Sequence, residues 1–108
     1  KSKKIKMLLC GITFKKNVPD IRNSKSIDLA KTLIKYGYLL DVYDPVFPKN
    51  NLDPKFKINL KNKILLNDKY DSIVICVDHD LFSKKGISFF KKHLYSNNSV
   101  FIDLKDIF

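Results

Sequence analysis

Four short and nearly continuous apolar runs constrain the fold more than any other feature of this sequence. Strands with one solvated face alternate apolar and polar residues, whereas strands covered on both faces are apolar throughout. Continuous runs of this length are typical of parallel strands in the middle layer of an α/β sheet. They predict a small, doubly wound, mostly parallel sheet flanked by helices. The runs occupy residues 7–10, 39–43, 73–77 and 100–102.

A helix is expected between the first two runs. Ser24 or Ser26 can cap its amino end, and Gly37 fits the position just after its last turn. Strand, helix and strand in succession form a βαβ unit, so the expected class is a Rossmann-like α/β fold. The apolar positions at helical spacing are Ile27, Ala30, Leu33 and Ile34.

The segments outside these elements give weaker signals. Prolines follow Asp44, Phe47 and Asp53, which disfavours regular structure between residues 45 and 67. Within this stretch we expect a short extended piece at residues 56–60, and a poor helix or a turn over 61–69. Residues 82–94 predict a helix that Gly86 divides, with one apolar face.

The composition indicates one domain and excludes several classes of protein. A chain of 108 residues with 44% hydrophobic residues can bury one core. No apolar run approaches the roughly 20 residues of a membrane span, and no secretory signal is recognisable. The two cysteines, Cys10 and Cys76, fall in expected strands without metal-ligand spacing, so we expect a reducing, cytoplasmic setting. Because no initiating Met precedes the first strand, we expect a piece of a longer protein.

The net charge of +10 favours anionic partners. The lysines are nevertheless scattered over the whole sequence, without a basic helix, an aromatic stacking motif or a zinc module. We therefore expect mainly a solvated basic surface and no nucleic-acid partner. A basic nucleic-acid-binding α/β module is the alternative function.

The segment between the first strand and the first helix, residues 11–24, is the most informative part of the chain. It is long for a βα connection, which usually has about 2–6 residues. It also starts at the carboxyl end of a strand, where open α/β sheets bind ligands. Lys15, Lys16 and Arg22 suit an anion such as a diphosphate. Gly11 stands alone, without a dinucleotide or P-loop fingerprint, so binding in the usual Rossmann manner is not expected.

Polar residues also follow the other three expected strands. Asp44 precedes Pro45 and is expected mainly to end its strand in a turn. His79 follows the third strand, where an acid–base group is conceivable but a helix-capping or solvated residue is the simpler interpretation. With Lys105 after the fourth strand, basic groups stand at two of the four strand ends, which raises the expectation of a ligand site at this edge.

A magnesium site of the receiver type is a further alternative. Asp78, Asp80 and Asp103 could supply its carboxylates. The paired acids that such a site requires after the first strand are replaced by Phe14 and Lys15. We therefore expect no metal site.

Four motifs resemble one known family. They are G-I-T-F-K from Gly11, P-D-I-R-N-S from Pro19, V-Y-D-P from Val42, and F-I-D-L-K-D-I-F from Phe101. In this order they resemble the C-terminal domain of the UDP-glucose/GDP-mannose dehydrogenases, and the resemblance covers almost the whole chain. The second motif is most similar to the UDP-N-acetylhexosamine 6-dehydrogenases.

The resemblance implies that residues 1–108 form the C-terminal nucleotide-sugar (UDP) binding domain of a larger enzyme. Such enzymes oxidise the C6 alcohol of a UDP-sugar to a uronic acid in two hydride transfers, for polysaccharide biosynthesis. Their N-terminal domain binds NAD, a central helical region dimerises, and a catalytic cysteine lies outside this domain. Neither cysteine here matches that nucleophile, so no catalytic residue is expected and the chain alone should be inactive. The sugar, and the choice of UDP or GDP, stay open.

The resemblance also implies roles for single residues. Phe14 and Lys15 would contact the UDP-sugar, with Lys15 facing its phosphates or the reacting sugar. Lys105 stands where the family often has a substrate-binding Arg; Lys keeps the charge and loses the bidentate fork. Arg22 would reach the NAD pyrophosphate across the domain interface, and Asp20 could orient it.

Overall fold

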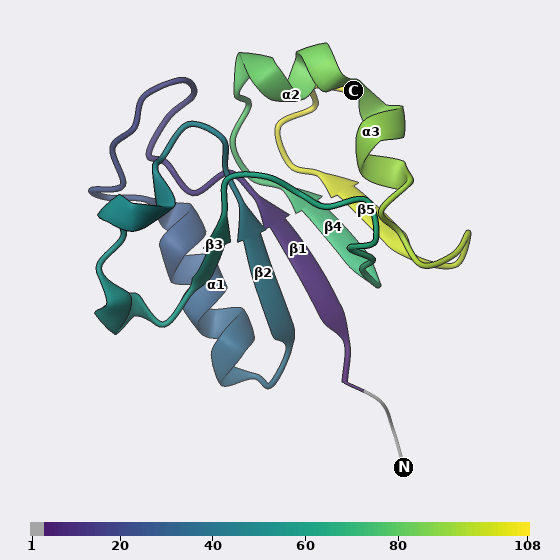
Figure 1. Cartoon of the computed structure of the whole chain (residues 1–108), viewed down its shortest axis with the longest axis horizontal. Coiled ribbons are helices and arrows are strands. Elements are labelled where there is room, and N and C mark those ends of the chain that lie inside the picture. The colour runs from purple at the N-terminus through teal and green to yellow at the C-terminus, as the bar shows by residue number, and fades with distance from the viewer. Residues whose placement is uncertain (1–3) are drawn as a thin grey trace.

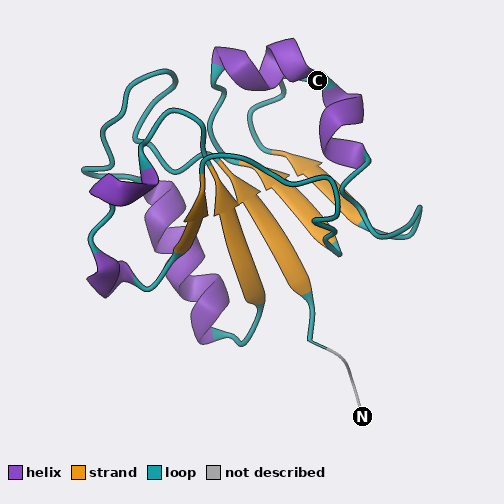
Figure 2. Cartoon of the chain, viewed as in Figure 1, coloured by secondary structure: helices purple, strands orange, loops and turns teal. Residues whose placement is uncertain are grey.

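The computed structural model describes residues 4–108 and contains one five-stranded sheet of order β3-β2-β1-β4-β5 (Figures 1 and 2). All strand pairs of this sheet are parallel. The strands are β1 (Lys6–Cys10), β2 (Leu39–Tyr43), β3 (Asn59–Lys61), β4 (Ser72–Ile75) and β5 (Val100–Asp103). The helices are α1 (Lys25–Lys35), α2 (Asp80–Lys85) and α3 (Ile87–Lys91), with short 3₁₀ turns η1 (Lys49–Asn51) and η2 (Pro54–Phe56).

The α/β prediction and all four predicted strands are confirmed. The extended piece expected at residues 56–60 is displaced towards the carboxyl end and forms the edge strand β3, which pairs with β2 from Asp41↔Asn59 to Tyr43↔Lys61. Residues 62–69 form turns without a helix. Residues 1–3 of the expected domain lie outside the described residues.

Strands β1, β2 and β4 are largely buried on both faces, which explains their continuous apolar runs. In β5, by contrast, Val100 and Ile102 are 51% and 40% exposed, so this run is covered on one face only. Leu8 and Cys10 of β1 point to the face that α2 and α3 cover, whereas Leu9 points to the face that α1 covers. On the first face they pack with Phe82 and Phe90, both fully buried. Complete burial of each such side chain stabilises the fold by about 1.5–3 kcal/mol.

The helix boundaries follow the predicted signals. Ser24 is the N-cap of α1, and its hydroxyl accepts the backbone N–H of Ile27 at 3.3 Å. Gly37 adopts a φ of +93° just after this helix. Gly86, at φ +80°, separates α2 from α3, as the sequence predicts. None of the described helices is long and apolar enough to cross a membrane.

The strand order reverses between β1 and β4, and the carboxyl ends of these strands meet the 11–24 loop and the start of α2 (Figure 1). This switch point is where doubly wound sheets bind ligands. The backbone segments that leave β1 and β4 are tightly packed there. Gly11 has a φ of +100°, and a Cβ at this position would lie 2.6 Å from the Cβ of Val77.

Candidate functional site

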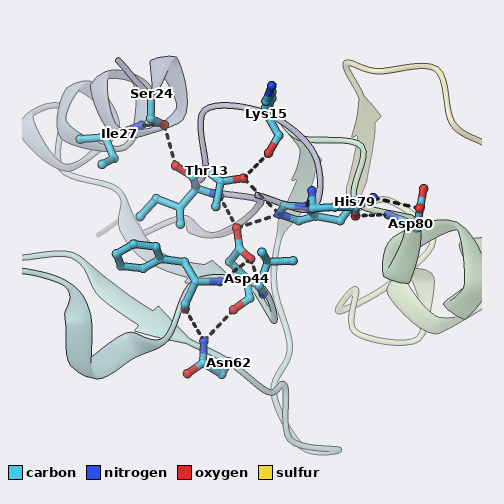
Figure 3. Close-up of polar contacts among 12 residues, drawn as sticks. Thr13, Lys15, Ser24, Ile27, Asp44, Asn62, His79 and Asp80 are labelled. Atoms are coloured by element: carbon cyan, nitrogen blue, oxygen red, sulfur yellow. Dashed lines mark hydrogen bonds and ion pairs between the residues drawn. The ribbon is translucent and has the colours of Figure 1, made fainter. Parts of the chain in front are cut away.

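The 11–24 loop has a defined shape that comes from its own hydrogen bonds. The backbone N–H of Phe14 donates to the carbonyl of Asp20 at 2.7 Å, which closes the loop on itself. The hydroxyl of Thr13 donates to the carbonyl of Lys15 at 2.9 Å. The ring of Phe14 is left 56% exposed, and the side chain of Lys15 points away from the loop's internal contacts (Figure 3). The loop therefore displays an aromatic ring and an ammonium group side by side in sequence.

Phe14 and Lys105 lie together in one pocket of about 250 Å³. Phe14 comes from the loop after β1, and Lys105 from the turn after β5, so the fold brings two sequence-predicted residues together from opposite ends of the chain. Lys15 does not line this pocket, although it adjoins Phe14 in the chain. The other lining residues are Thr13, Asn23, Lys25, Ser26 and Cys76.

The turn that holds Lys105 is built by the carboxylate of Asp103. One oxygen accepts the backbone N–H of Lys105 at 3.1 Å, and the other accepts those of Ile107 and Phe108 at 2.8 Å each. The ring of Phe108 packs against Phe90, with centroids 5.7 Å apart. Asp103 and Phe108 therefore shape the turn, and Lys105 is the residue that the turn exposes.

Arg22 does not line this pocket, although its neighbour Asn23 does. It lines a second, wider pocket of about 490 Å³ beside α1 and η2, together with Ile21, Asp28 and others. Its Nε and Nη2 donate to the carboxylate of Asp20 at 3.0 and 2.8 Å. The hydrogen bonds from the Arg22 side chain and backbone lower the pKa of Asp20 to about 2. The expected contact between Asp20 and Arg22 is confirmed, and it leaves Nη1 of Arg22 without a hydrogen bond to the described residues.

A buried Asp44–His79 pair lies beneath the loop (Figure 3), and the sequence analysis missed it. Both side chains are 0% exposed, and Nε2 of His79 lies 3.0 Å from Oδ2 of Asp44. The same Oδ2 accepts the backbone N–H of Ile12 at 2.7 Å, while Oδ1 accepts that of Val46 at 2.7 Å. Burial disfavours the charged form of Asp44, yet these hydrogen bonds outweigh burial and lower its pKa below the ordinary value.

Two sequence interpretations change accordingly. Asp44 does end β2 in a turn, through its bond to Val46, but it also joins the segments that follow β1, β2 and β4. The interpretation of His79 as a solvated or capping residue is wrong. His79 occupies the N-cap position of α2, but its ring makes no capping bond and is fully buried. Complete burial also keeps His79 from touching a substrate as an acid–base group.

The proximity of Asp44 and His79 could have been predicted in part from the sequence. The strands before Asp44 and His79 both neighbour β1, so their carboxyl ends meet at one edge of the sheet. No pattern in the sequence shows that both side chains turn inward. The pocket residues Thr13, Asn23 and Lys25 were also missed, because they are adjacent to recognised motif positions without belonging to them.

No group of three or more His, Cys, Asp or Glu side chains within residues 4–108 could hold a metal ion. Asp80 instead accepts a hydrogen bond from the side chain of Asn17 at 2.9 Å, and Asp103 is engaged in the turn described above. The carboxylates considered for magnesium are thus not gathered in one place.

Comparison with known proteins identifies the family. The family model described as "UDP-glucose/GDP-mannose dehydrogenase family, UDP binding domain" matches residues 8–108. The chain belongs to the UDP-glucose/GDP-mannose dehydrogenase family. The resemblance inferred from the sequence motifs is confirmed, and the match covers β1 through the end of the chain.

Relatives within this family are several times longer. The UDP-N-acetyl-D-glucosamine 6-dehydrogenase of Salmonella typhi is 35% identical over 80 residues, which cover 74% of this chain and 19% of that protein. The protein of the same name from Pseudomonas aeruginosa is 33% identical over 100 residues, covering 93% and 23%. This chain thus spans about a fifth of the length of these relatives.

Solved structures of UDP-sugar dehydrogenases share the fold. The native structure of the UDP-N-acetyl-mannosamine dehydrogenase Cap5O from Staphylococcus aureus superimposes with a TM-score of 0.73 at 26% identity, covering 97% of this chain and 23% of that one. The UDP-D-ManNAc dehydrogenase of Pyrococcus horikoshii gives 0.71 at 19% identity, covering 97% and 22%. At that low identity the second comparison supports the fold alone.

The two thiols of this UDP-glucose/GDP-mannose dehydrogenase domain lack the environment of a nucleophile. Both cysteines are free. Burial raises the pKa of Cys76 to about 12 and that of Cys10 well above its usual range. A thiol becomes nucleophilic only as the thiolate. We predict that Cys76 reacts with iodoacetamide at pH 8 at least about tenfold more slowly than free cysteine. Mass spectrometry of the time course would measure this, and equal rates would contradict it.

Proposed function

We propose that this chain is the nucleotide-sugar-binding domain of a larger NAD-dependent UDP-sugar 6-dehydrogenase. The observation that carries the proposal is the pocket that joins Phe14 and Lys105 at the carboxyl edge of the sheet. The family model's description as a UDP binding domain supports it. The names of the relatives make a UDP-N-acetylhexosamine the preferred substrate. The parent enzyme would oxidise the C6 alcohol to a uronic acid in two hydride transfers, for polysaccharide biosynthesis.

In this proposal the lysines of the site bind the diphosphate. Lys25 and Lys105 both line the pocket, and neither ammonium group forms an ion pair within residues 4–108. Charge-assisted hydrogen bonds to such groups are each worth about 1.5–3 kcal/mol. Lys15 would reach the phosphates or the sugar from the rim. The exposed ring of Phe14 offers an aromatic surface for the nucleotide or sugar ring.

Arg22 fits a role towards NAD, the cofactor that another domain of the parent would mainly hold. Asp20 fixes the guanidinium through Nε and one N–H of Nη2, while Nη1 and the other N–H of Nη2 are available for a second anion. Arg supports bidentate phosphate recognition of this kind. Arg22 lines a different pocket from Phe14 and Lys105, and Asn23 borders both, which agrees with two ligands bound next to each other. NAD itself would supply the hydride acceptor.

We predict that Lys105→Ala and Lys15→Ala each weaken UDP binding to the chain by at least about tenfold, equivalent to about 1.4 kcal/mol. The reason is loss of a cation that faces the diphosphate. A titration of the labelled chain by NMR, with GDP for comparison, would measure the dissociation constants. Lys35→Ala is the matched control, because Lys35 lies in the last turn of α1, away from the pocket. Equal weakening by Lys35→Ala would indicate diffuse charge attraction and contradict the site.

The same titration tests the nucleic-acid alternative. Binding through many phosphates falls steeply with salt and shows little preference for one nucleotide. A UDP site predicts shifts concentrated at Phe14 and Lys105 and a preference for UDP over GDP. Tight, salt-sensitive binding of an oligonucleotide without such a preference would favour the alternative.

A further inference from the structure

The ring of His79 connects the 11–24 loop to the interior of the domain. Its Nδ1 lies 2.9 Å from the backbone nitrogen of Asn17, whose N–H can only donate. Nδ1 must therefore be the unprotonated acceptor. Nε2 then carries the hydrogen and donates it to Asp44, 3.0 Å away. The neutral ring satisfies both contacts at once.

Asn17 joins the loop to the segment that follows β4. Its backbone adopts a φ of +63°, in the left-handed region. Its side chain donates to Asp80 at 2.9 Å and accepts the backbone N–H of Asp80 at 3.0 Å. Together with the bond to His79, three hydrogen bonds attach Asn17 to the amino end of α2.

Phe14 and Lys15 lie between this attachment and the end of β1. Thr13 donates to the carbonyl of Lys15, and its hydroxyl lies 3.4 Å from Nε2 of His79 (Figure 3). Phe14 and Lys15 are therefore bracketed by two residues that both approach the same buried ring. A loop of this length without regular structure would otherwise sample many conformations.

We infer that His79 is a positioning residue that locks the loop in the conformation presenting Phe14 and Lys15 to the nucleotide sugar. It acts through Asn17 and not by touching the substrate. None of the sequence motifs that carry the family resemblance contains His79. The inference rests on the proposed function of the pocket, but the loop attachment can be measured without any ligand.

Two substitutions separate the two bonds of the ring. In His79→Asn the side-chain oxygen stands near the place of Nδ1 and can accept from Asn17, while the contact to Asp44 is lost. In His79→Gln the amide nitrogen stands near the place of Nε2 and can donate to Asp44, while the acceptor for Asn17 is lost. Both remove a buried ring, so a merely structural role predicts similar effects of the two.

Amide hydrogen exchange and UDP titration by NMR on the intact chain give the test. We expect His79→Gln to speed exchange at Asn17 at least about tenfold. The same substitution should weaken UDP binding at least about fivefold, and His79→Asn should rescue most of both. The amide of Cys76, bonded to the carbonyl of Cys10 at 2.8 Å, reports on the intact sheet. Equal effects of the two variants at Asn17 would overturn the inference.

The role of His79 can also be tested if the chain does not bind UDP or if His79→Gln does not fold. If the wild-type chain does not bind UDP, the proposed function fails, while the exchange at Asn17 still decides whether His79 locks the loop. If His79→Gln does not fold, ¹⁵N-histidine spectra of the wild type decide. An unprotonated Nδ1 coupled to the Asn17 amide supports the lock, and a protonated Nδ1 overturns it.

Discussion

Gly11→Ala is expected to lower the free energy of unfolding by about 2–5 kcal/mol, a large part of the stability of a domain this size. An added Cβ would lie 2.6 Å from Cβ, 2.8 Å from Cγ2 and 2.9 Å from the backbone nitrogen of Val77. Relief would require the segments after β1 and β4 to separate, at about 1–3 kcal/mol for overpacking. The φ of +100° adds about 1–2 kcal/mol for a residue with a Cβ.

Gly37→Ala is the matched control for this prediction. Gly37 has a similar φ of +93°, but a Cβ there would meet nothing within 4 Å. It should therefore show the backbone cost alone. Urea unfolding followed by circular dichroism would give both free energies. If Gly11→Ala costs no more than Gly37→Ala, the close packing at the switch point is not what requires glycine.

The fold was predictable where local chemistry and tertiary packing agree. The runs that became β1, β2 and β4 are apolar because both faces are covered, and this requirement is visible in the sequence. The run that became β5 is apolar although Val100 and Ile102 stay exposed. The edge strand β3 was located only approximately, since Asn59 and Lys61 are polar and only Leu60 is buried in the core. Its strand character comes from pairing with β2, which no local pattern specifies.

The family resemblance named exposed residues of the proposed site, whereas the buried Asp44–His79 pair was not expected. Phe14, Lys15 and Lys105 were named because they stand in motifs that resemble the family, and their contacts with a substrate remain predictions. Asp44 and His79 looked like ordinary loop residues, because inward orientation depends on the convergence of three strand ends. Hydrogen bonds between residues 35 positions apart leave no periodic trace in the sequence.

Asp44→Asn is expected to lower the free energy of unfolding by about 2–6 kcal/mol, because two buried donors would lose their acceptor at about 1–3 kcal/mol each. Asp44 accepts hydrogen bonds from Ile12, Val46 and His79. An amide can replace one carboxylate oxygen, for example the one bonded to Val46, but its NH₂ would then face the N–H of Ile12 and Nε2–H of His79. The ring cannot change tautomer without losing its bond to Asn17.

The ionisation of Asp44 should make the free energy of unfolding decrease as the pH falls. Hydrogen bonds hold the pKa of folded Asp44 below its ordinary value, despite burial. Its contribution is therefore fully present above the unfolded pKa of about 3.9, and it is lost as the pH falls through the lower folded pKa. Urea unfolding from pH 7 to pH 2 should show wild type losing more stability than Asp44→Asn. Asp53→Asn, whose carboxylate is half exposed and forms only local contacts, is the control and should follow the wild-type curve. Parallel curves for wild type and Asp44→Asn would mean that folding does not lower the pKa of Asp44, and would contradict the prediction.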